Sequence, residues 1–251
     1  MGNALDDSSK GITFFQWMIL GTLTLTSTLY AMSMTIANIA LPQLQGALGA
    51  TQDQIAWTVT FNIVGTAIVT PMTGWLTLRF GQRRLMLCAI FGFATSSILC
   101  GQATALPELV IYRVFQGAFG GPLVPLSQAI ILGVFPRRLH SFATAVWGMG
   151  VVCGPIIGPT VGGYISEAYS WRWIFYIIAP FSLLAFLGSW LYVRDTMHDK
   201  LSKLDWTGFI SLSIAVTALQ LMLDRGNRLD WFDSKEILIE AAVAIICFYI
   251  F

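Results

Sequence analysis

Long apolar runs, each bounded by short polar segments, dominate the chain from residue 14 onward. A helix needs about 20 apolar residues to cross the roughly 30 Å hydrocarbon core of a bilayer. Seven runs have this length, and they predict membrane-spanning helices at residues 14–38, 54–78, 85–105, 108–132, 142–166, 172–193 and 206–223. An eighth run begins near Ile237 and stays short of a full span. The pattern therefore predicts an all-α, multi-pass membrane protein.

Composition supports this interpretation and argues against other classes of protein. Hydrophobic residues make up 56% of the chain and charged residues 11%, whereas about 25% are charged in a typical soluble domain. A net charge of +1 gives no basic surface for nucleic acid. The spans contain no Ser–His–Asp set, no carboxylate pair and no metal-ligand spacing. We therefore expect neither an enzyme nor a metal centre, and no cofactor.

The cationic residues are unevenly shared between alternate loops. Loops that would lie on one side of the membrane carry nine Lys and Arg residues, and loops on the other side carry four. By the positive-inside rule, the richer side and the N-terminus face the cytoplasm. The nine are Lys10, Arg79, Arg83, Arg84, Arg137, Arg138, Arg194, Lys200 and Lys203, and the four are Arg172, Arg225, Arg228 and Lys235.

The most charged internal segment marks the best domain boundary. It covers residues 194–205 and follows the sixth predicted span. We expect a cytoplasmic N-terminal segment at 1–13, a six-helix bundle at 14–193, a cytoplasmic linker at 194–205 and two linking helices at 206–251, the second incomplete. The chain reads as the front part of a longer protein, without a second bundle.

Glycines recur at four-residue intervals in the fifth predicted span. On a helix this spacing places them on one slowly winding ridge, where another helix can approach closely. Two prolines follow the same interval, and each removes a backbone hydrogen bond and bends the helix. Static packing of two helices would explain the glycines but not the prolines. A helix that bends at a moving interface would explain both the glycines and the prolines. The motif comprises Gly150, Gly154, Pro155, Gly158, Pro159, Gly162 and Gly163.

An arginine lies inside the fourth predicted span. Arg113 is about two turns from the outer end, and an arginine at a span centre costs about 2.5–3.5 kcal/mol on insertion scales. Gln116 and Gly117 follow at i+3 and i+4, on the same helix face. The side chain could also snorkel to the outer head groups. We favour a functional role, because no other ionisable residue lies so clearly inside a span.

The segment between spans two and three reads G-W-L-T-L-R-F-G-Q-R-R. Gly74 and Gly81 permit a tight cytoplasmic turn, and Arg79 and Arg83 could latch against a helix C-terminus, where cations are favoured. The alternative is that these arginines only set the topology.

Three amide side chains interrupt the apolar spans. They could line a transport pathway or form hydrogen bonds with a neighbouring helix, and both interpretations stay open. They belong to Asn38, Asn62 and Gln128.

Taken in order, these segments resemble the major facilitator superfamily, and within it the fourteen-helix drug:proton antiporters of the EmrB/QacA type. The Gly74–Arg84 segment is similar to the cytoplasmic loop between helices two and three, and R-V-F-Q-G from Arg113 resembles the helix-four motif. G-V-V-C-G-P-I-I-G-P-T-V-G-G from Gly150 resembles the helix-five antiporter motif. Two further matches are W-R-W-I-F-Y-I-I-A-P at 171–180 and L-M-L-D-R-G-N-R-L-D-W-F at 221–232.

The resemblance implies a two-bundle protein of the bacterial cytoplasmic (inner) membrane that works by alternating access. It would export amphipathic small molecules in exchange for protons, driven by the proton motive force, and act with a periplasmic adaptor and an outer-membrane channel. Arg113, with Gln116 and Gly117, would serve proton or substrate coupling. The glycine ridge would bend at the interface between bundles.

The chain departs from the family pattern at three positions. Ser33 stands near where helix one commonly carries an aspartate, Leu78 replaces the acidic residue before Arg79, and Ile178 replaces an asparagine. The sequence therefore identifies no proton carrier. The alternatives are a metabolite or siderophore transporter of the same superfamily, or a non-transporting membrane fragment.

Overall fold

The computed structural model describes residues 12–195, 205–227 and 229–251. All regular structure in these residues is helical, and seven helices are long and apolar enough to cross a membrane. The predicted fold class is therefore confirmed. Most of the expected N-terminal segment (1–13) and linker (194–205) lies outside the described residues.

The observed spans follow the apolar runs closely, and most helix ends fall within a few residues of the predicted ones. The six spans that form the bundle consist of α1 (Phe14–Ile39), α3 with η1 and α4 (Gln52–Val69, Thr70–Met72, Thr73–Phe80), α5 (Gln82–Gln102), α6 and α7 (Leu106–Gly120, Leu123–Val134), η2 and α8 (Arg137–Leu139, His140–Ala168), and α9 and α10 (Trp173–Tyr176, Ile178–Tyr192).

Within residues 205–227 and 229–251, three further elements follow the bundle. They are α11 (Trp206–Arg225), η3 (Trp231–Asp233) and α12 (Lys235–Ile250). With 16 residues, α12 is shorter than a membrane span requires.

Prolines divide two of the spans into shorter helices. Pro71 lies in the 3₁₀ turn between α3 and α4, and Pro122 lies between α6 and α7. Each lacks the N–H that would continue the helix ladder. The breaks follow from the sequence, although the apolar pattern alone predicts continuous spans.

One short helix was not expected. Residues 39–53 lie between the first two predicted spans, but eight of them form the helix α2 (Leu41–Leu48). Pro42 lies in its first turn, where the missing N–H costs nothing, and Gly49 ends it in the left-handed conformation. Pro42 therefore starts a new helix after α1 as well as ending the span.

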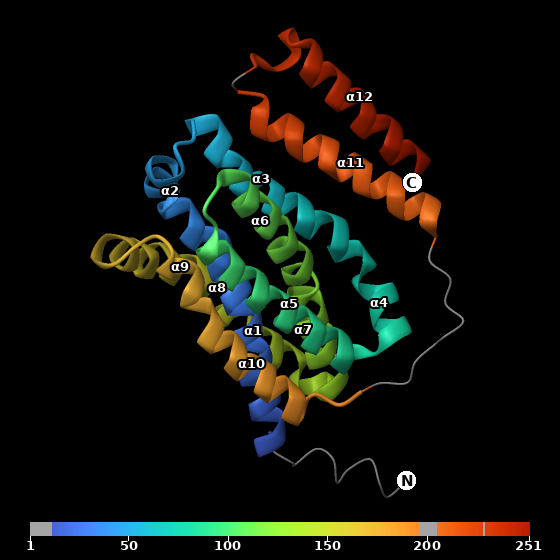
Figure 1. Ribbon diagram of the computed structural model, residues 1–251. Coiled ribbons are helices and arrows are strands. Elements are labelled where there is room, and N and C mark those ends of the chain that lie inside the picture. Colours follow the sequence, from blue (N-terminus) through green and yellow to red (C-terminus); the bar gives the residue numbers. More distant parts are fainter. Residues whose placement is uncertain (1–11, 196–204, 228) are drawn as a thin grey trace, which may run out of the picture.

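The bundle is built around α1, which packs against α8, α10 and α7. A second layer pairs α3 with α6, and α5 lies between α6 and α10. The antiparallel pair α11–α12 lies outside the bundle and rests on α3 through α11 (Figure 1). The buried core includes Leu23, Ile36, Met86 and Phe175.

Hydrogen bonds show which helix ends share a side of the bundle. The Gln16 amide donates to the Val134 carbonyl at 3.3 Å, and the Arg83 guanidinium donates to the Trp190 carbonyl at 2.6 Å. At the opposite end, Arg172 donates to the Ala103 carbonyl at 3.1 Å. The loops thus alternate between two sides as the charge distribution predicted. That the Arg83 side faces the cytoplasm stays a prediction.

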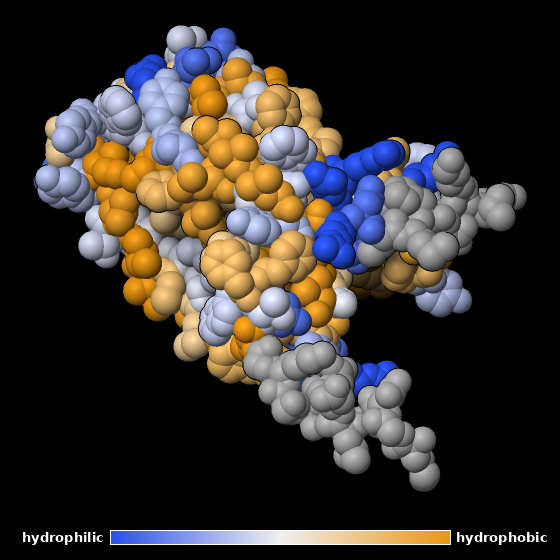
Figure 2. Space-filling view, turned by 90° about the horizontal axis from the view of Figure 1, so that it is seen from below, coloured by the Kyte–Doolittle hydropathy of each residue, from blue (hydrophilic) through white to orange (hydrophobic). Residues whose placement is uncertain are grey.

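Much of the outer surface is apolar. Large side chains such as Phe91, Ile156 and Leu191, on α5, α8 and α10, are more than 60% exposed, and hydrophobic residues gather in the middle of the face seen from below in Figure 2, beside polar ones. Such a surface suits contact with lipid.

Candidate functional site

The side chain of Arg113 turns into the bundle. Only 1% of the residue is exposed. Its Nε donates to the Thr58 carbonyl on α3 at 3.0 Å, and its Nη1 donates to Oε1 of Gln116 at 2.5 Å. These contacts exclude snorkelling in this conformation and place the charge between α3 and α6.

The arginine belongs to a polar network that joins three helices. The Gln116 amide donates to the Ser97 hydroxyl on α5 at 2.7 Å, and Ser97 donates to the Phe93 carbonyl at 2.8 Å. From α3, the Asn62 amide donates to the Arg113 carbonyl at 2.8 Å. Asn62 thus bonds to a neighbouring helix, which was one of its two predicted roles.

Gly117 allows α3 and α6 to lie in close contact. A Cβ at this position would collide with the Asn62 carbonyl. One turn further, the Thr66 hydroxyl lies 3.2 Å from the Gly117 carbonyl and accepts a hydrogen bond from Tyr30 on α1 at 3.0 Å. The predicted trio of Arg113, Gln116 and Gly117 therefore lies within one continuous network.

The charge of Arg113 has no carboxylate partner among the described residues. Its Nη2 has no hydrogen-bond partner there, and the guanidinium carbon lies 6.0 Å from the centroid of the Phe175 ring. Ser33, which the resemblance places near the position of a helix-one acid, is buried and donates to the Tyr30 carbonyl at 2.7 Å. The site is thus a buried cation with an unused donor, which suits interaction with an anionic group.

Several members of the network around Arg113 could not be identified from the sequence. The Thr58 contact uses a backbone carbonyl, which leaves no residue-type signal. Ser97 and Thr66 are small polar residues in apolar spans, and Ser97 follows Ser96 directly. A survey of hydroxyls within spans would have found both, although it would not have paired them with Gln116 or Tyr30.

Asn38 and Gln128 lie apart from this network. Both are exposed, Asn38 near the end of α1 and Gln128 on α7. The structure does not bring them to Arg113, and a pathway-lining role for either stays a prediction.

The glycine ridge faces α1, within the same bundle. A Cβ at Gly154 would lie 2.7 Å from the Thr28 carbonyl, and the Trp147 indole donates to Ser27 at 3.0 Å nearby. Both prolines lie inside the uninterrupted helix α8. Along the ridge, Gly150 faces Thr24, Gly154 faces Thr28, Gly158 faces Thr35, Gly162 faces Ile36 and Gly163 faces Ile39.

The opposite face of α8 is open. Val152 and Ile156 are 62% and 66% exposed. The glycines therefore serve close packing with α1, and only this outer face or a bend at Pro155 and Pro159 could act at an interface between bundles.

The segment from Gly74 to Arg84 turns at a single glycine. Gly81 has φ +88°, which other residues rarely adopt, and it separates α4 from α5. Gly74 lies inside α4 with open space around it, so the prediction that it shapes the turn is wrong. Arg79 is in the last turn of α4, and Arg83 donates to Trp190 in the last turn of α10. A contact between arginine and a helix C-terminus is therefore present.

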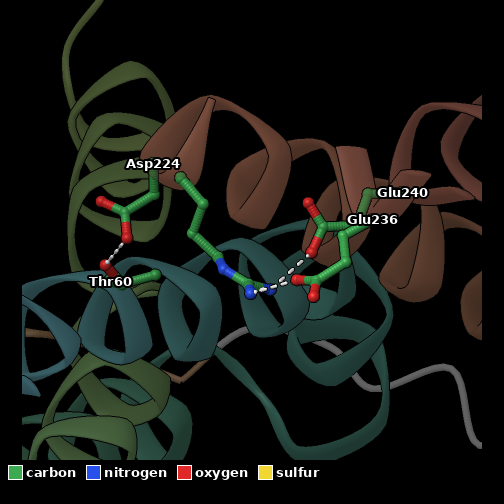
Figure 3. A network of polar contacts seen from close by, with 5 residues as sticks. Thr60, Asp224, Glu236 and Glu240 are labelled. Carbon is green, nitrogen blue, oxygen red and sulfur yellow. Dashed lines mark hydrogen bonds and ion pairs between the residues drawn. The ribbon is translucent and has the colours of Figure 1, made fainter. Parts of the chain in front are cut away.

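A second polar cluster joins the α11–α12 pair to the bundle (Figure 3). The Thr60 hydroxyl on α3 donates to Asp224 on α11 at 2.7 Å. Arg225 forms ion pairs with Glu236 at 2.6 Å and Glu240 at 3.0 Å on α12. The L-D-R-G segment thus links α3, α11 and α12 at one end of the molecule. No group of His, Cys, Asp and Glu in the described residues could hold a metal ion.

Sequence comparison identifies close relatives among multidrug exporters. The chain is 43% identical over 229 residues to "Multidrug export protein EmrB" of Haemophilus influenzae, covering 90% of the chain and 44% of the relative. It is 42% identical to the Escherichia coli protein of the same name (91% and 45%) and 40% identical to "Fatty acid resistance protein FarB" of Neisseria gonorrhoeae (85% and 42%). The chain thus spans less than half the length of these relatives.

Solved structures support the same fold. The human organic anion transporter MFSD10 superposes with a TM-score of 0.65 at 17% identity, over 84% of this chain and 56% of that one. The inward-open xylose transporter XylE of E. coli gives a TM-score of 0.65 at 17% identity, over 72% and 49%. The family model described as Major Facilitator Superfamily matches residues 23–251. The chain therefore belongs to the major facilitator superfamily.

Proposed function

We propose that this chain forms part of a transporter that exports amphipathic small molecules across the bacterial cytoplasmic membrane in exchange for protons. The observation that carries the proposal is the buried cation Arg113, which has no carboxylate partner among the described residues. The sequence identity of 43% to a protein named as a multidrug exporter also supports the proposal. The N-terminus would lie in the cytoplasm.

In this proposal, Arg113 acts electrostatically and stays protonated. A carboxyl group that approaches a buried guanidinium loses its proton more readily, because the cation stabilises the carboxylate. Ser33 cannot supply that carboxyl group, since a hydroxyl does not titrate near neutral pH. The acid would come from the substrate or from the part of a longer protein that this chain does not contain.

The transporter would work as the inner-membrane subunit of a three-part pump, with a periplasmic adaptor and an outer-membrane channel. The resemblance to EmrB-type proteins supports this arrangement. Co-purification of an adaptor with the tagged protein from a bacterial membrane would test it.

The function is tested with the longest reading frame that contains this chain, expressed in a strain lacking its own exporters. We expect resistance to several amphipathic compounds and dye efflux that stops when the pH gradient is collapsed. Uptake of one defined nutrient without any drug phenotype would contradict the proposal and favour a metabolite or siderophore transporter.

A further inference from the structure

An apolar cavity of about 380 Å³ lies between the helices of the second, third and fourth spans. Its size falls in the range of about 300–1,000 Å³ typical of small-molecule sites. The wall carries one charged side chain, Arg84, in the first turn of α5. The other lining residues are Val69, Leu76, Phe80, Leu85, Cys88, Ala89, Ala118, Phe119 and Pro122.

The cavity opens on the outer side of the bundle. Arg84 and Cys88 both line it, and both belong to an exposed stripe on α5 that continues through Phe91, Thr95 and Ile98. These residues follow each other at intervals of three and four, so they share one helix face. Apart from Arg84 and Thr95 the stripe is apolar, as expected for a face in contact with lipid. The cavity is therefore accessible from the bilayer.

The charge lies at the level where lipid head groups would be. Arg84 is three residues from the turn at Gly81, on the side of the bundle where positive charge predicts the cytoplasm. Its side chain is 76% exposed, and its ion pair with Asp195 is long, at 3.8 Å. Such an exposed pair contributes little and is readily exchanged for another anion. Arg83, next to it, is already bonded to the Trp190 carbonyl.

We propose that this cavity binds one acyl chain of an anionic phospholipid from the cytoplasmic leaflet, with the phosphate at Arg84. Basic pockets between membrane helices on the cytoplasmic side are known to suit anionic head groups. The apolar wall would contact the acyl chain. The Arg84 guanidinium would favour a lipid whose head group carries a net negative charge. This site is separate from the network of Arg113 and does not depend on the proposed transport function.

The test is native mass spectrometry of the purified protein with dioleoyl phosphatidylglycerol or dioleoyl phosphatidylcholine, which share the same chains. We expect more retained phosphatidylglycerol. In Arg84→Gln this preference should fall about fivefold, the effect of one cation near an anionic lipid. The matched control Arg137→Gln, which alters an exposed arginine away from the cavity, should keep it.

A second pair of variants tests the cavity itself. Cys88→Trp would fill the space and should abolish retention of both lipids, whereas Cys153→Trp, at an exposed cysteine on α8, should not. Unchanged lipid retention in Cys88→Trp, or an unchanged preference in Arg84→Gln, would overturn the proposal. Displacement of phosphatidylglycerol by an equal concentration of palmitate would assign the cavity to a single-chain acid and would also overturn it.

Discussion

The position of Arg113 is explained by a balance of opposing energies. An arginine at the centre of a span costs about 2.5–3.5 kcal/mol on insertion scales. Its two hydrogen bonds, to the Thr58 carbonyl and to Gln116, are each worth about 1.5–3 kcal/mol because the donor is charged. The folded protein therefore tolerates a buried charge that has no carboxylate partner among the described residues, and its Nη2 has no hydrogen-bond partner there.

Replacing Arg113 with alanine should abolish drug-dependent proton release, because the buried positive charge is lost. The protein should still reach the membrane at normal levels, since removing the guanidinium also removes the cost of burying a charge in the span, which offsets the lost hydrogen bonds. Arg113→Lys should also lose most activity, because an ammonium cannot reproduce the two-directional contacts of the guanidinium. The measurement is proton release from proteoliposomes on drug addition.

The control for this experiment is Arg137→Ala, which removes an exposed arginine distant from the network. It should leave proton release unchanged. Unimpaired release in Arg113→Ala would exclude the arginine from the coupling mechanism.

At this scale the sequence predicted contacts within one helix better than contacts between helices. The spacing of Arg113 and Gln116 predicted that both would share a face, and they are hydrogen-bonded to each other. The contact with the Thr58 carbonyl depends on how α3 and α6 pack, and a backbone acceptor has no signature in the sequence. The hydrogen bond between Gln116 and Ser97 likewise depends on helix packing, in this case between α6 and α5.

Among the helices, α8 combines two features with separate effects. Its glycines bring its backbone close to α1, as the 2.7 Å approach at Gly154 shows. Its prolines, Pro155 and Pro159, do not interrupt the helix, but each removes a backbone hydrogen bond and so weakens the helix where it occurs. In α8 the glycines thus allow close packing with α1, whereas the prolines, on a neighbouring face, make the helix easier to bend.

The double substitution Pro155→Ala and Pro159→Ala should stiffen α8. A proline costs a soluble helix about 3 kcal/mol, less in a membrane where neighbours satisfy the freed groups. Even about 1 kcal/mol regained would raise the midpoint of thermal unfolding by roughly 2–4 °C. We expect this rise in detergent together with a lower transport turnover number.

The matched variant Gly148→Ala, at a site on α8 with open space around it, should raise the midpoint by a similar amount, because alanine favours a helix over glycine by about 1 kcal/mol, but should leave the transport turnover number unchanged. If the proline variant transports at the normal rate, α8 has only a packing role and the bending hypothesis fails.

At the level of helices, apolar length predicted the seven spans well, because hydropathy reflects the bilayer directly. It could not predict α2, whose eight residues are too few to give an apolar run. Nor could it show that α4 continues the second span to Phe80. Of the two glycines in this segment, Gly74 and Gly81, only Gly81 therefore lies at the turn. These features depend on single Pro and Gly residues and on the local conformations that they allow.

As a whole, the described residues form one bundle with the α11–α12 pair attached to its side. Asp224 and Thr60 hold that pair to α3, and the Arg225 ion pairs hold α12 to α11. Alternating access requires two halves that rock about a shared site near the middle of the membrane. A single bundle with an open apolar surface cannot close such a site by itself.

We therefore expect the 251-residue chain, expressed alone and reconstituted in liposomes, to move neither drug nor proton under an imposed pH gradient. The longest reading frame that contains it, reconstituted at equal density, is the positive control. Drug flux coupled to the gradient from the 251-residue chain would contradict this expectation. That outcome would require a homodimer in which two copies supply the two bundles, and it could be recognised because activity would then rise with the square of the protein density at low density.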